Sequence, residues 1–362
     1  DSRIEALLGT ARTGTGEQTV IKSSGHLTDT YAVTNANSPA AQNFGNYEWI
    51  NADPTVNINA EEVEAEGIYT GYKYYETRYA DTVLGQGNAD ATVGSSTGKA
   101  WDYDNEVSYP FGYGLSYTTF EQTLKSVDVD LENRTVTAEV EVKNTGDVAG
   151  KDVIEIYYTA PYTNGGIEKA AANLIAFEKT ETLDPGAAGT KSITINKEDM
   201  ASYDSEGIKI SGGGYILEAG EYTISLRSDS HTVVAEEKFT VDSDIDYSKD
   251  GRSSDETVST NQFEDYSRGD FEQLSRANGF ANYESACGKL SEDAYVMSDE
   301  TRKAVEENVF GIYDGTKYND DSDEMPKMEQ DNGLQLADLT GKSYDDEDWD
   351  KLLDQLSFED MS

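Results

Sequence analysis

The chain has 362 residues, of which 36% are hydrophobic, and its 71 Asp and Glu against 28 Lys and Arg give a formal net charge of −43. This charge repels nucleic-acid phosphates and anionic lipid surfaces, so neither is an expected partner. The single cysteine, Cys287, excludes a disulfide within the chain and a cysteine-based zinc cage, and no apolar run approaches the about 18 residues that a membrane span needs.

The first 119 residues are polar but contain two tyrosine-rich segments. Residues 66–79 read EGIYTGYKYYETRY, and residues 108–120 read SYPFGYGLSYTTF. Between them, residues 85–101 are rich in glycine and serine, which predicts a long loop. The second segment is a ring-dense loop in an otherwise acidic and polar chain.

The pattern changes from about residue 120, where apolar and polar residues alternate with a period of two. Such alternation predicts half-buried strands, here at residues 135–142, 152–158, 190–195, 221–226 and 237–241. Turn sequences such as Asn144-Thr-Gly146 and Asp184-Pro-Gly186 lie between them. Several short strands over about 120 residues predict an all-β sandwich.

After Val241 the chain is rich in Asp, Ser and Lys and has no period as far as about Lys342, so we expect this stretch to bury little and to wrap or link. An amphipathic helix of about three turns is then predicted from the spacing of Trp349, Leu352, Leu353 and Leu356. Residues 357–360, SFED, match a capping box that would begin a second helix. We therefore expect the chain to be interrupted at the start of another domain.

Five segments, in order along the chain, resemble the family 3 glycoside hydrolases, the β-glucosidase and β-xylosidase family. Residues 108–120 resemble the family's joint between an α/β sandwich domain and a fibronectin type III-like domain. Residues 24–31, SGHLTDTY, resemble its "SGRLPDT" strand, with His26 in the place of the usual Arg. The other three are similar to further family motifs: residues 66–76, residues 143–150 (KNTGDVAG) and residues 199–204 (DMASYD).

The resemblance implies a domain order. Residues 331–339 and 344–361 resemble the entry to the family's catalytic (β/α) barrel, which would here follow the fibronectin-like domain, as in a permuted branch of the family. The expected domains are the end of the α/β sandwich (1–119), a fibronectin type III-like β-sandwich (120–243), an extended linker (244–342) and the first turns of the barrel (343–362). The fold class is thus mostly β, with an immunoglobulin-like sandwich flanked by a partial α/β domain and a linker that ends in a short helix.

The implied chemistry is retaining hydrolysis of a glycosidic bond, which needs two carboxylates about 5–5.5 Å apart. The family places its nucleophilic Asp deep in the barrel and its acid/base Glu upstream of the "SGRL" strand. Glu5 and Glu17 are the nearby glutamates here, and Glu17 better matches a non-catalytic loop of the family. We therefore assign no catalytic residue, substrate-binding residue, metal ligand or cofactor, and treat Glu61 and Glu62 as solvated surface.

The ring-dense loop has two interpretations. Its rings, Tyr109, Phe111, Tyr113 and Tyr117, could stack on the faces of a sugar. Alternatively they fill the joint between two domains, where Gly112 and Gly114 allow close backbone approach. We favour the joint.

Weaker signals do not change this assignment. Asp246, Ser248 and Asp250, followed by Gly251, match the first half of a calcium loop, but position 12 is Thr257 and cannot supply the bidentate carboxylate. The two histidines, His26 and His231, do not form a sequence pair for a metal.

Two functions stay open at this point. One is a part of a β-glucosidase-type hydrolase that acts on an oligosaccharide or β-glucoside once joined to a catalytic barrel, and that is inactive alone. The other is a non-catalytic carbohydrate-binding or cell-surface structural protein that reuses the scaffold. Neither function involves nucleic acid or a membrane span, and self-association is left open.

Overall fold

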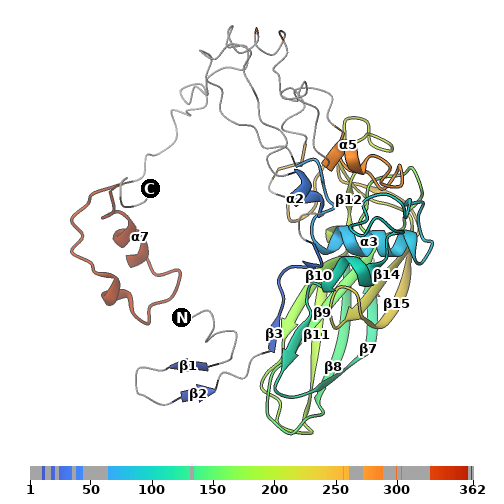
Figure 1. Cartoon of the computed structure of the whole chain (residues 1–362). Coiled ribbons are helices and arrows are strands. Elements are labelled where there is room, and N and C mark those ends of the chain that lie inside the picture. The colour runs from blue at the N-terminus through green and yellow to red at the C-terminus, as the bar shows by residue number, and fades with distance from the viewer. Residues whose placement is uncertain are drawn as a thin grey trace. The chain divides into compact units, whose positions relative to one another are not determined.

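The computed structural model describes residues 10–12, 18–20, 24–34, 38–43, 64–130, 134–255, 257–260, 272–287, 299, 303, 327–357 and 360. The chain divides into two compact units, residues 1–302 and 303–362, which are described separately (Figure 1). Within the described parts, no helix is long and apolar enough to cross a membrane.

Two antiparallel sheets form a β-sandwich in the first unit (Figure 1). One sheet has the order β11-β8-β7, with β7 at Phe120–Asp130, β8 at Thr135–Asn144 and β11 at Ala188–Asn196. The other has the order β10-β9-β14-β15, with β9 at Val153–Thr159, β10 at Asn173–Lys179, β14 at Gly220–Arg227 and β15 at Val233–Val241. The all-β sandwich that the alternation predicts is confirmed.

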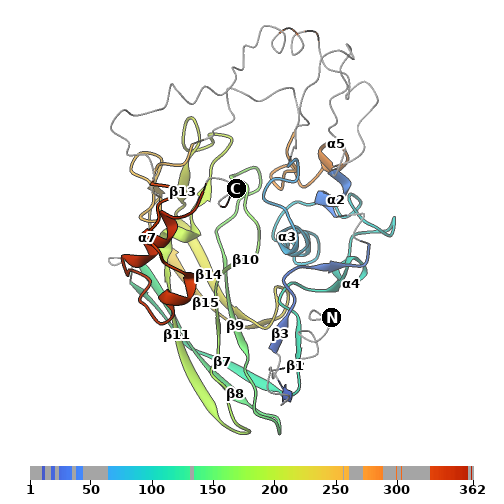
Figure 2. The same ribbon diagram turned by 90° about the vertical axis from the view of Figure 1, so that its left-hand side faces the viewer.

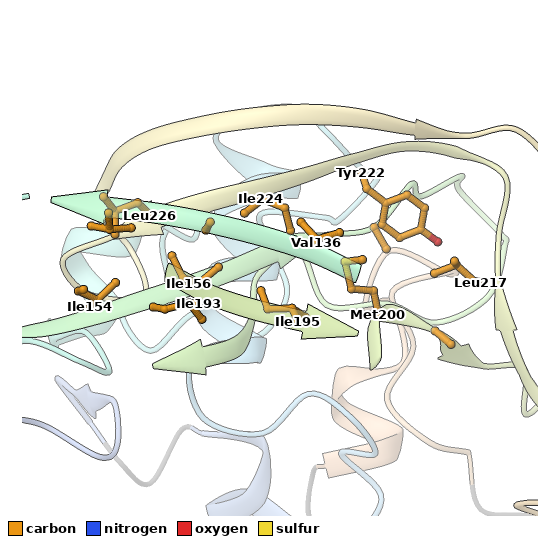
Figure 3. Packing of buried hydrophobic residues seen from close by; sticks show 14 of the residues in the cluster. Val136, Ile154, Ile156, Ile193, Ile195, Met200, Leu217, Tyr222, Ile224 and Leu226 are labelled. Carbon is orange, nitrogen blue, oxygen red and sulfur yellow. The ribbon is translucent and has the colours of Figure 1, made fainter. Parts of the chain in front are cut away.

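The sandwich core lies between the inward faces of the two sheets (Figure 3). Strand β8 shows the origin of this core, because its alternate residues are fully buried: Val136, Ala138, Val140 and Val142. From the other sheet, Ile154, Ile156, Ile224 and Leu226 meet them. The period-two pattern in the sequence is therefore the pattern of burial.

A small third sheet extends this core beyond residue 243. It contains β12 (Ser202–Tyr203), β13 (Tyr215–Leu217) and β16 (Ile245–Asp246), with a 3-10 helix, η2, at Lys197–Met200 before it. Tyr247, which follows β16, is buried in the sandwich core.

The segment before the sandwich forms short elements that gather on one side of it (Figure 2). Strand β3 (Ser24–His26) pairs with β6 (Gly114–Ser116), and β4 (Tyr31–Ala32) pairs with β5 (Val107–Tyr109). The helices are α2 (Pro39–Asn43), α3 (Tyr72–Thr82) and α4 (Tyr103–Glu106). A separate hairpin joins β1 (Thr10–Arg12) to β2 (Gln18–Val20).

A second, aromatic core surrounds helix α3, and the chain returns to complete it after leaving the sandwich. Residues 272–287, with helix α5 at Tyr283–Cys287, bury Leu274, Phe280 and Cys287 against Tyr69, Tyr74 and Trp101. We expected this stretch to bury little, and for these residues that expectation is wrong. The sequence gives no period there because isolated apolar residues pack against a core that is already formed by other segments.

The second unit is small and polar. It contains a 3-10 helix, η6, at Leu336–Leu339 and helix α7 at Asp348–Leu353. The segment before η6 is joined to the segment after α7 by two backbone hydrogen bonds, from Glu329 N to Leu356 O and from Gln330 N to Asp354 O. Helix α7 begins near the predicted position but has six residues and buries none of them, so it is shorter than the predicted three turns. The predicted capping box is confirmed by reciprocal bonds between Ser357 and Asp360.

Candidate functional site

The candidate site is the seam between the sandwich and the elements before it, because four of the five recognised segments meet there. Strands β3 and β6 come from segments about 90 residues apart, and Gly25 pairs with Leu115. Gly114 faces the backbone oxygen of Gly25 so closely that any Cβ would overlap it. The predicted need for close backbone approach at Gly114 is therefore met at this pair of strands.

The ring-dense loop contributes to the seam with only some of its rings. Phe111 packs against Tyr72 of α3, with ring centroids 4.8 Å apart, and its carbonyl accepts the Ser230 N–H at 2.8 Å. Tyr109 and Tyr117 instead remain 48% and 59% exposed. The favoured interpretation, rings that fill the joint, thus holds for Phe111 and not for the exposed rings of Tyr109 and Tyr117.

His26 is the central charged group at one end of the seam. Its Nδ1 donates to the carbonyl of Gly112 and lies 3.3 Å from Glu155 Oε1, while its Nε2 lies 3.8 Å from Asp152 Oδ1. Burial opposes the charged imidazolium, but Asp152 and Glu155 outweigh this effect and raise the pKa of His26 to about 9. His26 is therefore a cation at neutral pH.

Gly112 is needed for this arrangement. Its φ of +81° lies in the left-handed region, and a Cβ there would overlap the carboxylate of Glu155. Tyr157 donates its hydroxyl to the same carboxylate at 2.7 Å, and burial beside that carboxylate raises the pKa of Tyr157. The loop, the histidine and strand β9 are thus fixed to one another.

A pocket of about 230 Å³ opens beside His26. Gln122 donates to Asp152 Oδ2 at 2.8 Å at its wall. The other lining side chains are mixed in polarity: Leu115, Ser116, Thr118, Phe120, Ser228 and Val234.

A second polar cluster is centred on Glu76 of helix α3, which is almost fully buried. The carboxylate accepts bonds from Tyr103 Oη at 2.6 Å and Ser230 Oγ at 3.1 Å, and it lies 3.0 Å from His231 Nδ1. The ring of Tyr103 stacks on His231 at 3.7 Å. Burial and the neighbouring Glu76 raise the pKa of Tyr103, so the phenol stays a donor. Ser230 and His231 follow strand β14, so this cluster binds the sandwich to α3.

Arg276 joins three parts of the first unit. Its guanidinium pairs with Asp81 of α3, donates to the Lys169 carbonyl at 2.8 Å and lies 3.7 Å from the centre of the Tyr162 ring. Its backbone N–H donates to Glu168 at 2.9 Å. The returning segment, helix α3 and the loop between β9 and β10 therefore meet at one side chain.

Arg78 has a different environment, because it donates to two backbone carbonyls and to the Tyr74 hydroxyl and pairs with no carboxylate among the described residues. Its Nη2 donates to Asp90 O at 2.9 Å and Val93 O at 2.8 Å, and the cation lies 5.4 Å from the rings of Trp101 and Phe280. Arg78 is fully buried and thereby fixes the glycine-rich loop to α3.

The remaining recognised residues support turns. Asn144, in the NTG segment, accepts the Thr118 hydroxyl at 2.7 Å and donates to Val148 O and Leu183 O. Asp204 accepts the backbone N–H groups of residues 208, 209 and 210. Both residues are buried and satisfy backbone groups, which explains why turns need them.

The chemistry of this arrangement is that of a rigid scaffold. Glu76, Glu155 and Asp81 each accept bonds from donors on other elements, so none is placed as a free acid or base. Glu5, Glu17, Glu61 and Glu62 lie outside the described residues. In the part of the chain that the structure describes, no three His, Cys, Asp or Glu residues are placed to hold a metal ion.

The residues proposed for calcium and the lone thiol have local explanations. Asp246 accepts the Ser248 N–H at 2.7 Å, which makes a turn. Cys287 is fully buried, and burial raises the pKa of its thiol to about 12, so it stays protonated. Sequence reasoning missed Glu76, Glu155 and Arg276, because the partners that tie them to other segments, Ser230, His26 and Asp81, lie more than 100 residues away in the chain.

Comparisons with known proteins agree with this architecture. A model of the fibronectin type III-like domain matches residues 152–230. The chain is 34% identical over 235 residues to a β-glucosidase of Ruminococcus albus, covering 65% of this chain and 20% of that protein. It is 34% identical over 238 residues to β-glucosidase A of Butyrivibrio fibrisolvens, covering 62% and 24%.

Solved structures are similar over a comparable share. β-Glucosidase 3B of Thermotoga neapolitana, in complex with α-D-glucose, is 29% identical with a TM-score of 0.46 and covers 63% of this chain and 26% of that one. A β-glucosidase of Paenibacillus barengoltzii is 29% identical with a TM-score of 0.48, covering 62% and 21%. The chain thus spans about a fifth to a quarter of the length of these relatives.

Proposed function

Because this chain is a family 3 β-glucosidase-like chain with a fibronectin type III-like domain, we propose that it is the scaffold portion of a retaining β-glycosidase. In this role it carries no nucleophile and supports the active site of a catalytic barrel. The proposed reaction of the whole enzyme is hydrolysis of terminal non-reducing β-D-glucosyl or related residues in oligosaccharides.

The observation that carries this proposal is the seam. Ionisable side chains from strand β3, the returning segment, helix α3 and the sandwich meet at Arg276–Asp81, Glu76–His231 and Glu155–His26. Such enclosed and mutually paired groups hold the elements that carry them in a fixed orientation. A fixed orientation is what a barrel needs from the domains that surround it.

The domain plan belongs to the same proposal. We assign residues 1–119 to the end of an α/β sandwich, 120–243 to the fibronectin-like domain, 244–342 to a connecting segment whose residues 272–287 pack into the aromatic core, and 343–362 to the start of the barrel. The partner is then a catalytic barrel domain or chain that supplies the nucleophilic Asp.

Two measurements test the proposal on purified protein. The chain alone is expected to release no aryl alcohol from an aryl β-glucoside, while native mass spectrometry of protein from its source is expected to show this sequence within a longer polypeptide or bound to a barrel-sized partner. Turnover by the pure chain would contradict the scaffold role. A stable 39.7 kDa species without a partner would contradict the enzyme reading.

A carbohydrate-binding role is the second candidate, and it is favoured by the exposure of Tyr109 and Tyr117 at the seam. Exposed rings stack on sugar faces. If this role is correct, saturation-transfer NMR on the chain with cello-oligosaccharides will show binding that Tyr109→Ala weakens. If the scaffold role alone is correct, no transfer will be seen.

A further inference from the structure

His26 stands between two parts of the first unit that are distant in sequence. It ends strand β3, while Asp152 and Glu155 lie just before and within strand β9. The imidazole lies 3.3 Å from Glu155 and 3.8 Å from Asp152, and its side chain is 18% exposed. The ring is thus mostly enclosed but can still exchange protons with water.

The polar groups around the imidazole ring come from three segments of the chain. Strand β9 supplies Glu155, and the residue just before it is Asp152. Strand β7 supplies the neutral Gln122 that donates to Asp152, and the loop before β6 supplies the Gly112 carbonyl. Tyr157 donates to Glu155 on its far side, and Arg227 lies over the Tyr157 ring at 5.2 Å. His26 is therefore the cation in direct contact with both carboxylates.

Loss of one proton from the His26 imidazolium would turn its attraction to Asp152 and Glu155 into an unfavourable contact. A neutral imidazole keeps one N–H, which can continue to donate from Nδ1 to Gly112. Its Nε2 would then present a lone pair toward Asp152, and two enclosed carboxylates would lose their countercharge. Such uncompensated charges are costly to bury, so the contact would weaken.

We propose that His26 is a pH-sensitive latch, which holds strand β3 and the Gly112 loop on the sandwich while it is charged and releases them when it loses its proton. The latch acts on the packing of the seam and not on the chemistry of a glycosidic bond. It is therefore independent of the scaffold role proposed above.

The direction of the pH effect follows from the raised pKa. The folded-state pKa of His26 is about 9, against an ordinary value of 6.5. The stabilisation is complete below about pH 6.5 and is lost as the pH rises through 9. A difference of this size corresponds to a loss of up to roughly 300-fold in the folding equilibrium constant.

The full chain contains only two histidines, so NMR can follow His26 directly. The imidazole Cε1–H of His26, assigned by comparison with His231→Gln, is expected to titrate near pH 9. A midpoint near 6.5 would overturn the proposal. This measurement needs no His26 variant and does not depend on how well one folds.

A matched pair of variants tests the release itself. The folding equilibrium constant is measured by urea unfolding at pH 7 and at pH 10. Between these values it is expected to fall on the order of 100-fold more in the wild-type chain than in His26→Arg, whose charge does not titrate. His231→Gln should keep the wild-type pH response, because it leaves the His26 contacts in place. Equal pH responses in wild type and His26→Arg would overturn the latch.

Discussion

At the scale of single residues, the first unit is held by charged groups that would be unfavourable if buried alone. Arg276 and Asp81 are almost fully enclosed, and each satisfies the other. Breaking a buried pair is more costly than breaking one at the surface, because the remaining charge is left without water or a partner. Surface pairs such as Lys238–Glu221 are exposed and contribute little.

Arg276→Met should therefore destabilise the chain by about 3–5 kcal/mol in urea unfolding, because Asp81 loses its countercharge. The double variant Arg276→Met with Asp81→Leu should recover part of this loss. Lys238→Met provides a surface control and should leave the unfolding midpoint nearly unchanged. Asp81→Leu alone completes the cycle, and a loss in the double variant equal to the sum of the losses in Arg276→Met and Asp81→Leu would show that the pair is not coupled.

A glycine at the seam gives a second test. Gly112→Ala introduces both left-handed strain and overlap with the Glu155 carboxylate. Gly165, with φ of +77° and open space around its Cβ position, is a matched control that introduces the strain alone. Gly165→Ala should cost about 1 kcal/mol, and Gly112→Ala should cost clearly more in the same denaturation experiment. Equal losses would exclude a close contact at Gly112.

At the scale of elements, two strands and one returning segment depart from the sequence expectations. Strands β7 and β10 were not predicted, and both lie at sheet edges with a register shift. A register shift interrupts the period of two within each of these strands, so the continuous alternation that revealed the other sandwich strands is broken there. The segment of residues 272–287 has no period at all, yet it completes the aromatic core.

The importance of this segment can be tested with two phenylalanines. Phe280 is fully buried among Tyr69, Tyr74 and Arg78, whereas Phe177 on edge strand β10 is 71% exposed. Phe280→Ala should lower the unfolding free energy by about 3–5 kcal/mol, and Phe177→Ala should have little effect. If both changes are tolerated equally in urea unfolding, the returning segment does not stabilise the aromatic core.

At the scale of the whole molecule, the net charge of −43 opposes compaction through self-repulsion. The 71 acidic residues outnumber the 28 basic ones by 43, so most carboxylates cannot each pair with a different Lys or Arg. Salt screens such repulsion over about 10 Å at 0.1 M.

The melting temperature should therefore rise when NaCl is increased from about 10 mM to about 0.5 M at pH 7, because surface repulsion is screened more strongly than the enclosed pairs. Differential scanning fluorimetry with matched concentrations of a neutral osmolyte separates screening from general exclusion effects. A falling melting temperature would mean that salt removes more stabilisation from exposed ion pairs than it removes destabilisation from repulsion among the excess negative charges.

The sequence by itself determined the β-sandwich and the family resemblance, because both depend on local patterns. Alternation along Thr135–Asn144 records which side chains face inward, and motifs such as residues 108–120 keep their spacing in the linear chain. Only the tertiary structure decided the seam. Glu76, Arg276 and His26 look like ordinary charged or polar residues in sequence, and each acquires its role from a partner on a distant segment. Burial of a charge depends on what surrounds it in three dimensions, and a one-dimensional pattern carries no record of that.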